Sequence, residues 1–255
     1  MYEQLQQLLL DSSYTLAFTG AGISTLSGIR DFRGSDGIYR STWNGMEVES
    51  ILSAEVFASD PSIFYRWARE FVYNLDKFKP SIVHMTLALL EEKGYLAGVY
   101  TQNIDLLHQK AGSKHVWELH GSPAHHSCPR CQKTYTYEQV APQVQSGAVP
   151  LCADCFIPMR PGIVLYGDPL DGKLLDQAYM DMSKAQLLLV LGSSLTVQPA
   201  ASLPMATFYR GGKLVIINAQ DTPLDRHAKI RLNDLGSTFE HLYHWAMALP
   251  PRITK

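Results

Sequence analysis

The four cysteines of this chain form two C-x-x-C pairs, Cys128 and Cys131 followed by Cys152 and Cys155. Thiolates at this spacing are typical ligands of a tetrahedral zinc ion. Two disulfides would also use all four residues, and a redox-active pair is a further alternative. In a reducing compartment the spacing favours zinc, so we predict a structural Zn²⁺ bound by the four cysteines. None is then left over as a catalytic nucleophile.

A glycine-rich turn, Gly20-Ala21-Gly22, follows the apolar run YTLAF. Glycines after a buried strand let backbone N–H groups approach phosphate oxygens, and a following helix N-terminus adds favourable dipole charge. A dinucleotide fingerprint would place its third glycine where Thr25 stands, and an acidic residue after a second strand about twenty positions on. No strand is evident around position 40. The turn therefore predicts phosphate binding but disfavours an ordinary dehydrogenase.

Other apolar runs also end in polar residues or glycine. These are Gln102, Asn103 and Asp105 after one run, His120 after another, Gly192, Ser193 and Ser194 after a third, and Asn218 after a fourth. Any one of them could be only a turn residue or a helix cap. In an open parallel sheet, however, ligands bind outside the carboxyl ends of the strands. Together these residues predict one shared crevice.

Near-continuous apolar runs predict strands that are buried on both faces of a parallel sheet. The runs occupy residues 14–20, 96–103, 115–121, 162–168, 186–194 and 213–218. Helical periodicity marks residues 81–94, 171–185 and 238–249, and residues 1–13 are typical of an amphipathic helix. The alternation of strands and helices predicts an α/β fold, a Rossmann-like doubly wound parallel sheet.

Two segments interrupt this alternation and predict a small second domain. Residues 35–80 are rich in aromatic side chains and fit a helical insertion. Residues 123–160 contain the cysteines in a polar, turn-rich context that is typical of a zinc-ribbon module. The Rossmann-like domain would then consist of residues 1–34, 81–122 and 161–255.

Charge and composition favour neither nucleic acid nor membrane as a direct partner. The chain has 255 residues, a net charge of −2 and no long basic run. Its N-terminus lacks the basic region of a signal peptide. We expect a cytoplasmic protein and take a monomer as its simplest state.

The stretch GAGISTLSGIRDFRG at 20–34 resembles the signature of the sirtuins, the NAD-consuming protein deacylases. The resemblance continues, in order, through TQNIDLLHQKAG, ELHGS, the two cysteine pairs, RPGIVLYGD, GSSLTVQPA and INAQDTP. These motifs span nearly the whole chain and are similar to those of the compact bacterial and archaeal members. The resemblance implies a protein lysine deacetylase that uses NAD as a co-substrate.

The resemblance also implies which residues bind NAD. Those implied for the pyrophosphate and the adenosine ribose are Gly20, Ala21, Gly22, Thr25, Gly192, Ser193, Ser194 and Asn218. Asp31, Phe32 and Arg33 would lie on a glycine-bounded lid that closes before chemistry. On this lid, Phe32 would shield the reacting sugar from water and Arg33 would help to order the loop.

The Q-N-I-D motif is implied to bind the nicotinamide end of NAD. Asn103, Ile104 and Asp105 would line the nicotinamide pocket, where Asp105 can accept a hydrogen bond from the carboxamide. Gln102 would position the ribose. Bending of the amide favours cleavage of the glycosidic bond, so Asn103 is counted with the catalytic residues.

His120 is the candidate general base. By resemblance, the acetyl oxygen of an acyl-lysine attacks C1′ of the ribose and forms an O-alkylimidate. His120 then activates a ribose hydroxyl that attacks the imidate carbon, a step suited to an imidazole with a solution pKa of about 6.5. Water completes the reaction and yields lysine, nicotinamide and O-acetyl-ADP-ribose.

The acyl-lysine protein substrate is expected to add a strand beside Val164, Leu165 and Tyr166, with Val164 accepting from the acyl-lysine amide. Family members that prefer succinyl or malonyl groups carry a Tyr-x-x-Arg pair. Here Ala68 stands three residues after Tyr65, so we expect an apolar acyl pocket.

Four further histidines receive structural interpretations. His125 and His126 precede a closed four-cysteine site, so we expect them on the surface of the ribbon. His84 and His108 lie in helical patterns, where a packed or solvent-facing ring is the default.

Three alternative functions remain open from the sequence. An ADP-ribosyltransferase would break the same bond of NAD but would pass the sugar to another nucleophile. An NAD-sensing or zinc-dependent interaction module would lack turnover, although His120 and Arg33 are both present. A dehydrogenase is the most distant alternative.

Overall fold

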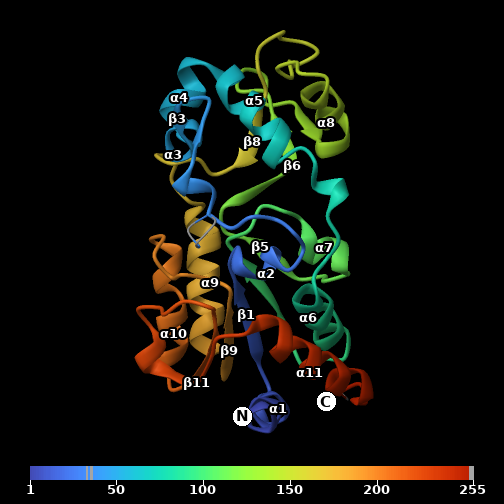
Figure 1. The fold of residues 1–255 in the computed structure, drawn as a ribbon, viewed down its shortest axis with the longest axis vertical. Coiled ribbons are helices and arrows are strands. Elements are labelled where there is room, and N and C mark those ends of the chain that lie inside the picture. The colour runs from blue at the N-terminus through green and yellow to red at the C-terminus, as the bar shows by residue number, and fades with distance from the viewer. Residues whose placement is uncertain (33, 35–36, 253–255) are drawn as a thin grey trace.

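The computed structural model describes residues 1–32, 34 and 37–252 and contains a six-stranded parallel sheet (Figure 1). The strand order is β11-β10-β9-β1-β4-β5. The strands are β1 (Thr15–Thr19), β4 (Gly98–Thr101), β5 (Val116–Glu118), β9 (Leu187–Leu191), β10 (Lys213–Ile217) and β11 (Ala228–Leu232). Every residue of β1, β4 and β9 is buried, as the apolar runs predict.

Helices cover both faces of this sheet because successive strand side chains point to opposite sides. One face packs against α1 (Tyr2–Asp11), α6 (Ile82–Glu92) and α11 (Leu235–Ala248). The other face packs against α9 (Gly172–Lys184) and α10 (Pro204–Tyr209). In β1, for example, Ala17 belongs to the first core, whereas Leu16 and Phe18 belong to the second. The predicted α/β doubly wound class is confirmed.

A second unit lies beyond the carboxyl ends of the strands, away from both termini (Figure 1). Its helices are α3 (Val48–Ile51), α4 (Ala54–Ser59), α5 (Pro61–Phe71) and α8 (Tyr137–Gln145). Its strands are β2 (Thr42–Trp43) and β3 (Met46–Glu47), which form a hairpin, and β6 (Gly121–Ser127), β7 (Thr134–Thr136) and β8 (Arg160–Ile163), which form an antiparallel sheet. A separate core joins the two chain segments, with Tyr65, Trp67 and Tyr137 among its aromatic residues.

The apolar run at residues 162–168 does not belong to the parallel sheet. It was expected as a strand of the parallel sheet, but β8 ends at Ile163 and pairs antiparallel with β6. The apolar side chains of Ile163 and Leu165 are buried in the core of the second unit, which accounts for the pattern. The chain therefore enters the second unit near Gly121, where β6 begins, and returns to the sheet domain only after Leu165 and before α9.

Short elements complete the structure. They are α2 (Gly22–Thr25), α7 (Leu107–Ala111) and the 3₁₀ turns η1 (Ile38–Arg40), η2 (Leu75–Lys77), η3 (Ala200–Ser202) and η4 (Asp225–His227). Over the residues that the structure describes, no helix combines the length and the apolar character needed to cross a bilayer.

Candidate active site

A cavity of about 900 Å³ opens at the carboxyl ends of the parallel strands, between the sheet and the second unit. Most of the site residues expected from the sequence line it. These are Gly20, Ala21, Gly22, Thr25, Asp31, Phe32, Gln102, Asn103, Ile104, His120, Val164, Leu165, Tyr166, Gly192, Ser193, Ser194 and Asn218. Asp105 is not among the lining residues, and Arg33 lies outside the described residues.

The glycine turn after β1 interlocks with the turn after β9. A Cβ at Gly20 would lie 2.7 Å from the Gly192 carbonyl oxygen, and one at Gly22 would lie 2.7 Å from Gly192 Cα. The Gly20 N–H donates to the Leu191 carbonyl oxygen, and the Gly22 N–H donates to the Gly192 carbonyl oxygen. Two N–H groups that were expected to meet phosphate are therefore used within the protein, and the glycines here serve close backbone packing.

The turn after β4 carries two cavity residues and is held from several sides. The Gln102 N–H donates to the Thr19 carbonyl, and the Gln102 side-chain oxygen accepts from Ser193 Oγ at 2.7 Å. The Asn103 amide Nδ2 donates to the Gly20 carbonyl and to Ser24 Oγ, both at 3.2 Å. These bonds connect the ends of β1, β4 and β9 into one polar floor.

Asp105 lies directly beneath this floor. Its Oδ2 accepts from Ser24 Oγ at 2.6 Å, and its Oδ1 accepts from the Leu107 N–H at 3.0 Å. Burial raises the pKa of the Asp105 carboxyl, an effect that these two hydrogen bonds oppose. Ser24 was not among the residues expected at the site, although its place two residues after Gly22 in the GAGIS motif is an indication of its role.

His120 lies on the cavity between the end of β5 and the start of β6, where the chain enters the second unit. Its Nδ1 lies 3.0 Å from the Gln102 carbonyl oxygen, which can only accept, so Nδ1 carries the hydrogen. In the neutral ring, Nε2 is then the basic nitrogen. The next residue, Gly121, has φ +65°, and a Cβ there would lie 1.9 Å from the Gly162 carbonyl oxygen. This contact is the physical reason for the His-Gly pair.

The described part of the segment that was expected to form a lid is hydrogen-bonded to η1. The Asp31 carbonyl accepts from the Ile38 N–H at 2.8 Å, and its side chain accepts from the Gly34 N–H at 2.8 Å. The Phe32 ring packs on the Tyr39 ring, with centroids 5.1 Å apart. Phe32 thereby lies against the cavity from the side of the second unit.

The short segment that was expected to line the peptide groove is held by backbone hydrogen bonds to two other parts of the chain. The Val164 N–H donates to the His120 carbonyl, and the Tyr166 N–H donates to the Leu52 carbonyl, both at 2.8 Å. The Leu165 N–H donates to Asp168, which also pairs with Arg160. This ion pair, which was not expected from the sequence, fixes the turn after Tyr166.

The wall formed by the second unit is apolar. Leu52, Trp67 and Ile163 line the cavity there, and α5 buries Ala68 completely. Arg66 and Arg69 lie on the exposed faces of α5. Among the described lining residues there is no lysine or arginine.

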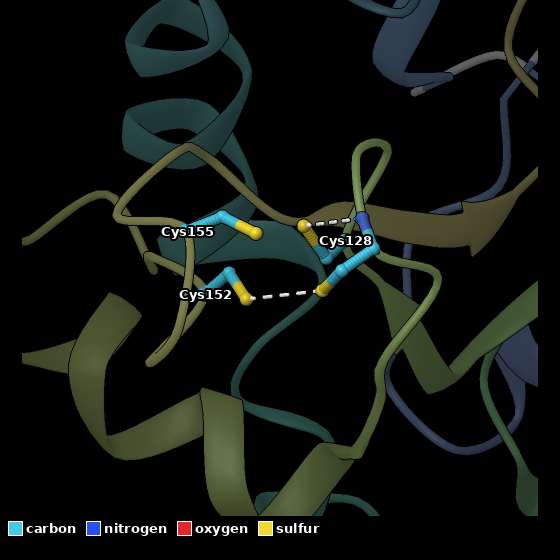
Figure 2. Close-up of side chains that lie close together, drawn as sticks. Cys128, Cys152 and Cys155 are labelled. Carbon is cyan, nitrogen blue, oxygen red and sulfur yellow. Dashed lines mark hydrogen bonds between the residues drawn. The ribbon is translucent and has the colours of Figure 1, made fainter.

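The four cysteine sulfurs gather in the second unit, and Figure 2 shows the side chains of Cys128, Cys152 and Cys155 pointing toward one another. Their sulfurs all lie within 4.8 Å of one another, and the Cys131 and Cys152 sulfurs are 3.7 Å apart. Tetrahedral zinc with Zn–S bonds of about 2.3 Å requires sulfurs about 3.8 Å apart, whereas a disulfide requires about 2.05 Å. All four cysteines are free, so the arrangement fits zinc and excludes the disulfide alternative.

The two cysteine turns repeat one backbone pattern. Cys128 accepts at its carbonyl from Gln132 and donates its N–H to Lys133; Cys152 does the same with Phe156 and Ile157. Gln132 and Phe156 both have positive φ, at +60° and +55°. Each turn therefore presents its two thiols toward the same point.

His126 does not lie where the sequence predicted it. It was expected on the surface, but it is 1% exposed and its Nε2 is hydrogen-bonded to the Tyr73 hydroxyl. The alternation of β6 places His126 in the core while His125 stays exposed. His84 and His108 are also buried, which agrees with the packed alternative.

One part of the cavity wall was not expected from the sequence. Asn233, Asp234, Leu235 and Gly236 line the cavity at the end of β11. The strand AKIRL contains two basic residues and is only partly buried, so it gave no apolar run. Without the strand, its carboxyl end could not be assigned to the crevice.

Comparison with known proteins agrees with this geometry. The model of the Sir2 family matches residues 20–199. The chain is 47% identical over 231 residues to an NAD-dependent protein deacetylase of Thermotoga maritima, covering 91% of this chain and 92% of that one. It is 39% identical over 227 residues to NAD-dependent protein deacylase 1 of Archaeoglobus fulgidus, covering 88% and 89%.

Solved structures show the same similarity. A structure described as Sir2-p53 peptide-NAD⁺ has a TM-score of 0.84 and 44% identity, with 96% of each chain covered. A structure of Sir2Tm bound to a propionylated peptide has a TM-score of 0.83 and 43% identity, with 95% of each chain covered. The chain belongs to the Sir2 family.

Proposed function

We infer that this chain is an NAD-dependent protein lysine deacetylase, which converts acetyl-lysine and NAD to lysine, nicotinamide and O-acetyl-ADP-ribose. The observation that carries this inference is the single cavity, which brings together the glycine turn, Asn103 and His120. Relatives and solved structures of the family are named for this activity, for NAD⁺ and for acylated peptides.

NAD would occupy the part of the cavity nearest to the sheet. We propose that the turns at Gly20–Gly22 and Gly192–Ser194, together with Thr25 and Asn218, bind its phosphates and adenosine ribose. Since the Gly20 and Gly22 N–H groups are already bonded, their contribution is the absence of a Cβ. Asp31, Phe32 and Arg33 would form the lid over the reacting sugar, although Arg33 lies outside the described residues.

Gln102, Asn103 and Ile104 would bind the ribose and nicotinamide. We propose that Asn103 meets the nicotinamide from the polar floor, since it lines the cavity. In the described geometry both carboxylate oxygens of Asp105 have protein donors. A direct bond from Asp105 to the carboxamide would therefore compete with the donation from Ser24 or be added to it.

His120 would act as the general base through Nε2. The acyl oxygen displaces nicotinamide from C1′, and His120 takes a proton from the ribose hydroxyl that attacks the imidate carbon. The bond between Nδ1 and the Gln102 carbonyl keeps the ring in the tautomer that this step requires. Water then releases lysine and O-acetyl-ADP-ribose.

The peptide would lie along Val164, Leu165 and Tyr166. The Val164 N–H is bonded inward to His120, so its carbonyl is the group proposed to accept from the acyl-lysine amide. The apolar wall beyond it suits acetyl or longer neutral acyl chains. Zinc would be structural, because the four cysteines lie in the second unit and none lines the cavity.

Product analysis tests the proposal. Purified protein is incubated with NAD and an acetyl-lysine peptide, and the products are identified by mass spectrometry. We expect deacetylated peptide with O-acetyl-ADP-ribose, and we expect His120→Ala to lower the rate at least about a hundredfold. ADP-ribose attached to protein, with the acetyl group retained, would indicate an ADP-ribosyltransferase instead.

Three further properties stay proposals. We propose a cytoplasmic protein with a monomer as its simplest state. The net charge of −2 and the absence of a long basic run support the further proposal that it has no direct nucleic-acid or membrane partner. We also propose residues 1–34, 81–122 and 161–255 as the NAD-binding domain, with residues 35–80 and 123–160 as the small domain. The separate cores of the two units support a division into two domains, whereas Ile163 and Leu165 pack in the core of the second unit and favour a boundary after Leu165.

A further inference from the structure

Two buried histidines lie behind the polar floor of the cavity. His84 on α6 is 0% exposed and His108 on α7 is 1% exposed. Their ring centroids are 4.7 Å apart, with the ring planes inclined at 59°. Neither histidine lines the cavity, and the proposed mechanism uses neither.

The hydrogen bonds of His108 determine its tautomer. Its Nε2 lies 2.9 Å from Thr19 Oγ1 at the end of β1. The Thr19 hydroxyl donates its single hydrogen to Thr101 Oγ1 at 2.8 Å, so it can only accept from His108. Nε2 of His108 therefore carries the hydrogen, and Nδ1 is a bare acceptor.

The bonds of His84 determine its tautomer in the same way. Its Nδ1 accepts from the Ser81 backbone N–H at 3.2 Å, so Nε2 carries the hydrogen. Within the described chain, His84 Nε2 and His108 Nδ1 have no hydrogen-bond partner. One is a donor and the other an acceptor on neighbouring rings, but the two atoms are not hydrogen-bonded to each other.

Both rings are uncharged at neutral pH, as these tautomers require. Burial lowers the pKa of His84 to about 4. Burial also lowers the pKa of His108 well below its usual value, and the neighbouring His84 lowers it further.

The chain of bonds continues from His108 to the active site. Thr101 Oγ1, which accepts from Thr19, also accepts from the Asn103 N–H at 3.0 Å. The same turn presents Gln102, whose carbonyl accepts from His120 Nδ1. The Gln102–Asn103 backbone, which places Asn103 and orients His120, is thus hydrogen-bonded to the Thr101 hydroxyl, which in turn accepts from the Thr19 hydroxyl. By donating to Thr19 Oγ1, His108 fixes the direction in which the Thr19 hydroxyl donates.

We propose that His108 is a positioning residue for the deacylation reaction. Acting through the Thr19 and Thr101 hydroxyls, it holds the Gln102–Asn103 turn in the geometry that nicotinamide and His120 require. Its effect on catalysis rests on the proposed function, whereas the tautomers of His84 and His108 can be measured without any activity.

Substitutions along the chain test the proposal. His108→Phe removes the donor, and His108→Gln retains a side-chain N–H. We expect His108→Phe to lower kcat/KM for NAD about tenfold, which is the effect of about one neutral hydrogen bond, and His108→Gln to stay within about threefold of the wild type. Thr19→Val, which keeps the shape of threonine, should match His108→Phe.

A double variant separates positioning from general damage. Because His108 acts through Thr19, His108→Phe combined with Thr19→Val should lose no more than about twofold beyond His108→Phe alone. Thr207→Val is the matched control, since Thr207 is a buried threonine that donates to the Met182 carbonyl away from the cavity. It should keep wild-type kcat/KM even if its Tm falls.

All variants are assayed below their melting transitions. If His108→Phe does not fold, Thr19→Val alone carries the kinetic test. Wild-type kcat/KM in Thr19→Val, or independent losses in the double variant, would overturn the proposal. So would ¹⁵N NMR spectra that show hydrogen on Nδ1 of His108. An inactive wild-type protein with the expected tautomers would overturn the proposed deacylation instead.

Discussion

The buried ring of His84 predicts a specific loss of stability in acid. Its folded-state pKa is about 4, against a usual value of 6.5. Between these two values the unfolded chain binds a proton that the folded chain does not, so the free energy of unfolding falls as pH falls. Above about pH 6.5 the His84 ring is neutral in both states and costs no stability; the loss of unfolding free energy grows as pH falls from 6.5 toward 4.

The size of the effect follows from the same two values. One pKa unit corresponds to about 1.36 kcal/mol, so at pH 5 the wild type should have lost about 2 kcal/mol through His84. His84→Leu removes the titrating ring, and it also removes the bond to Ser81 at every pH. Only the slope of stability against pH therefore reports the titration.

Urea unfolding of the two proteins at pH 7.5, 6.5, 5.5 and 5.0 measures this slope. Contributions common to both, including any loss of zinc, cancel in the difference. We expect the stability of His84→Leu relative to the wild type to rise by about 2 kcal/mol from pH 7.5 to 5.0. Thr207→Val, which removes no titrating group, should parallel the wild type. Parallel curves for wild type and His84→Leu would refute the reasoning.

Three further predictions concern the site. Metal analysis should find one zinc per chain, and Cys152→Ser should abolish binding and lower Tm; full activity of the metal-free protein would contradict the structural role. Gly121→Ala should cost about 3 kcal/mol of stability and impair kcat through the neighbouring base. Gly211→Ala, at a φ of +84° but with nothing within 4 Å, should cost less, and equal losses would exclude the clash at Gly121. Acetyl-lysine peptides should exceed succinyl-lysine peptides at least about tenfold in kcat/KM, and faster succinyl turnover would show that a cation reaches the pocket.

Much of the fold could be predicted because the central strands are apolar on both sides. The runs that contain β1, β4, β9 and β10 were identified correctly because helices cover both faces of the sheet. The same rule failed at 162–168, where Ile163 and Leu165 are apolar for a different reason, namely packing in the second unit. An apolar run indicates burial but does not name the core that buries it.

Residues whose chemistry requires a particular type could be found in the sequence. The cysteines are fixed by their spacing, and Gly121 marks His120 because only glycine fits against Gly162. The roles of Ser24 and Asp168 could not be derived in this way, because they depend on side-chain partners that folding brings near, Asp105 at 81 residues' separation and Arg160 at eight. Contacts of that kind exist only once the chain has folded.

The stoichiometry of the reaction distinguishes NAD-dependent deacetylation from other reactions at this site. Purified protein is mixed with an acetyl-lysine peptide and limiting amounts of NAD, and nicotinamide and deacetylated peptide are measured in the same samples. We expect one nicotinamide to be released per acetyl group removed, and no removal when NAD is omitted. Removal of acetyl groups without NAD, or release of nicotinamide that is independent of the peptide, would contradict it.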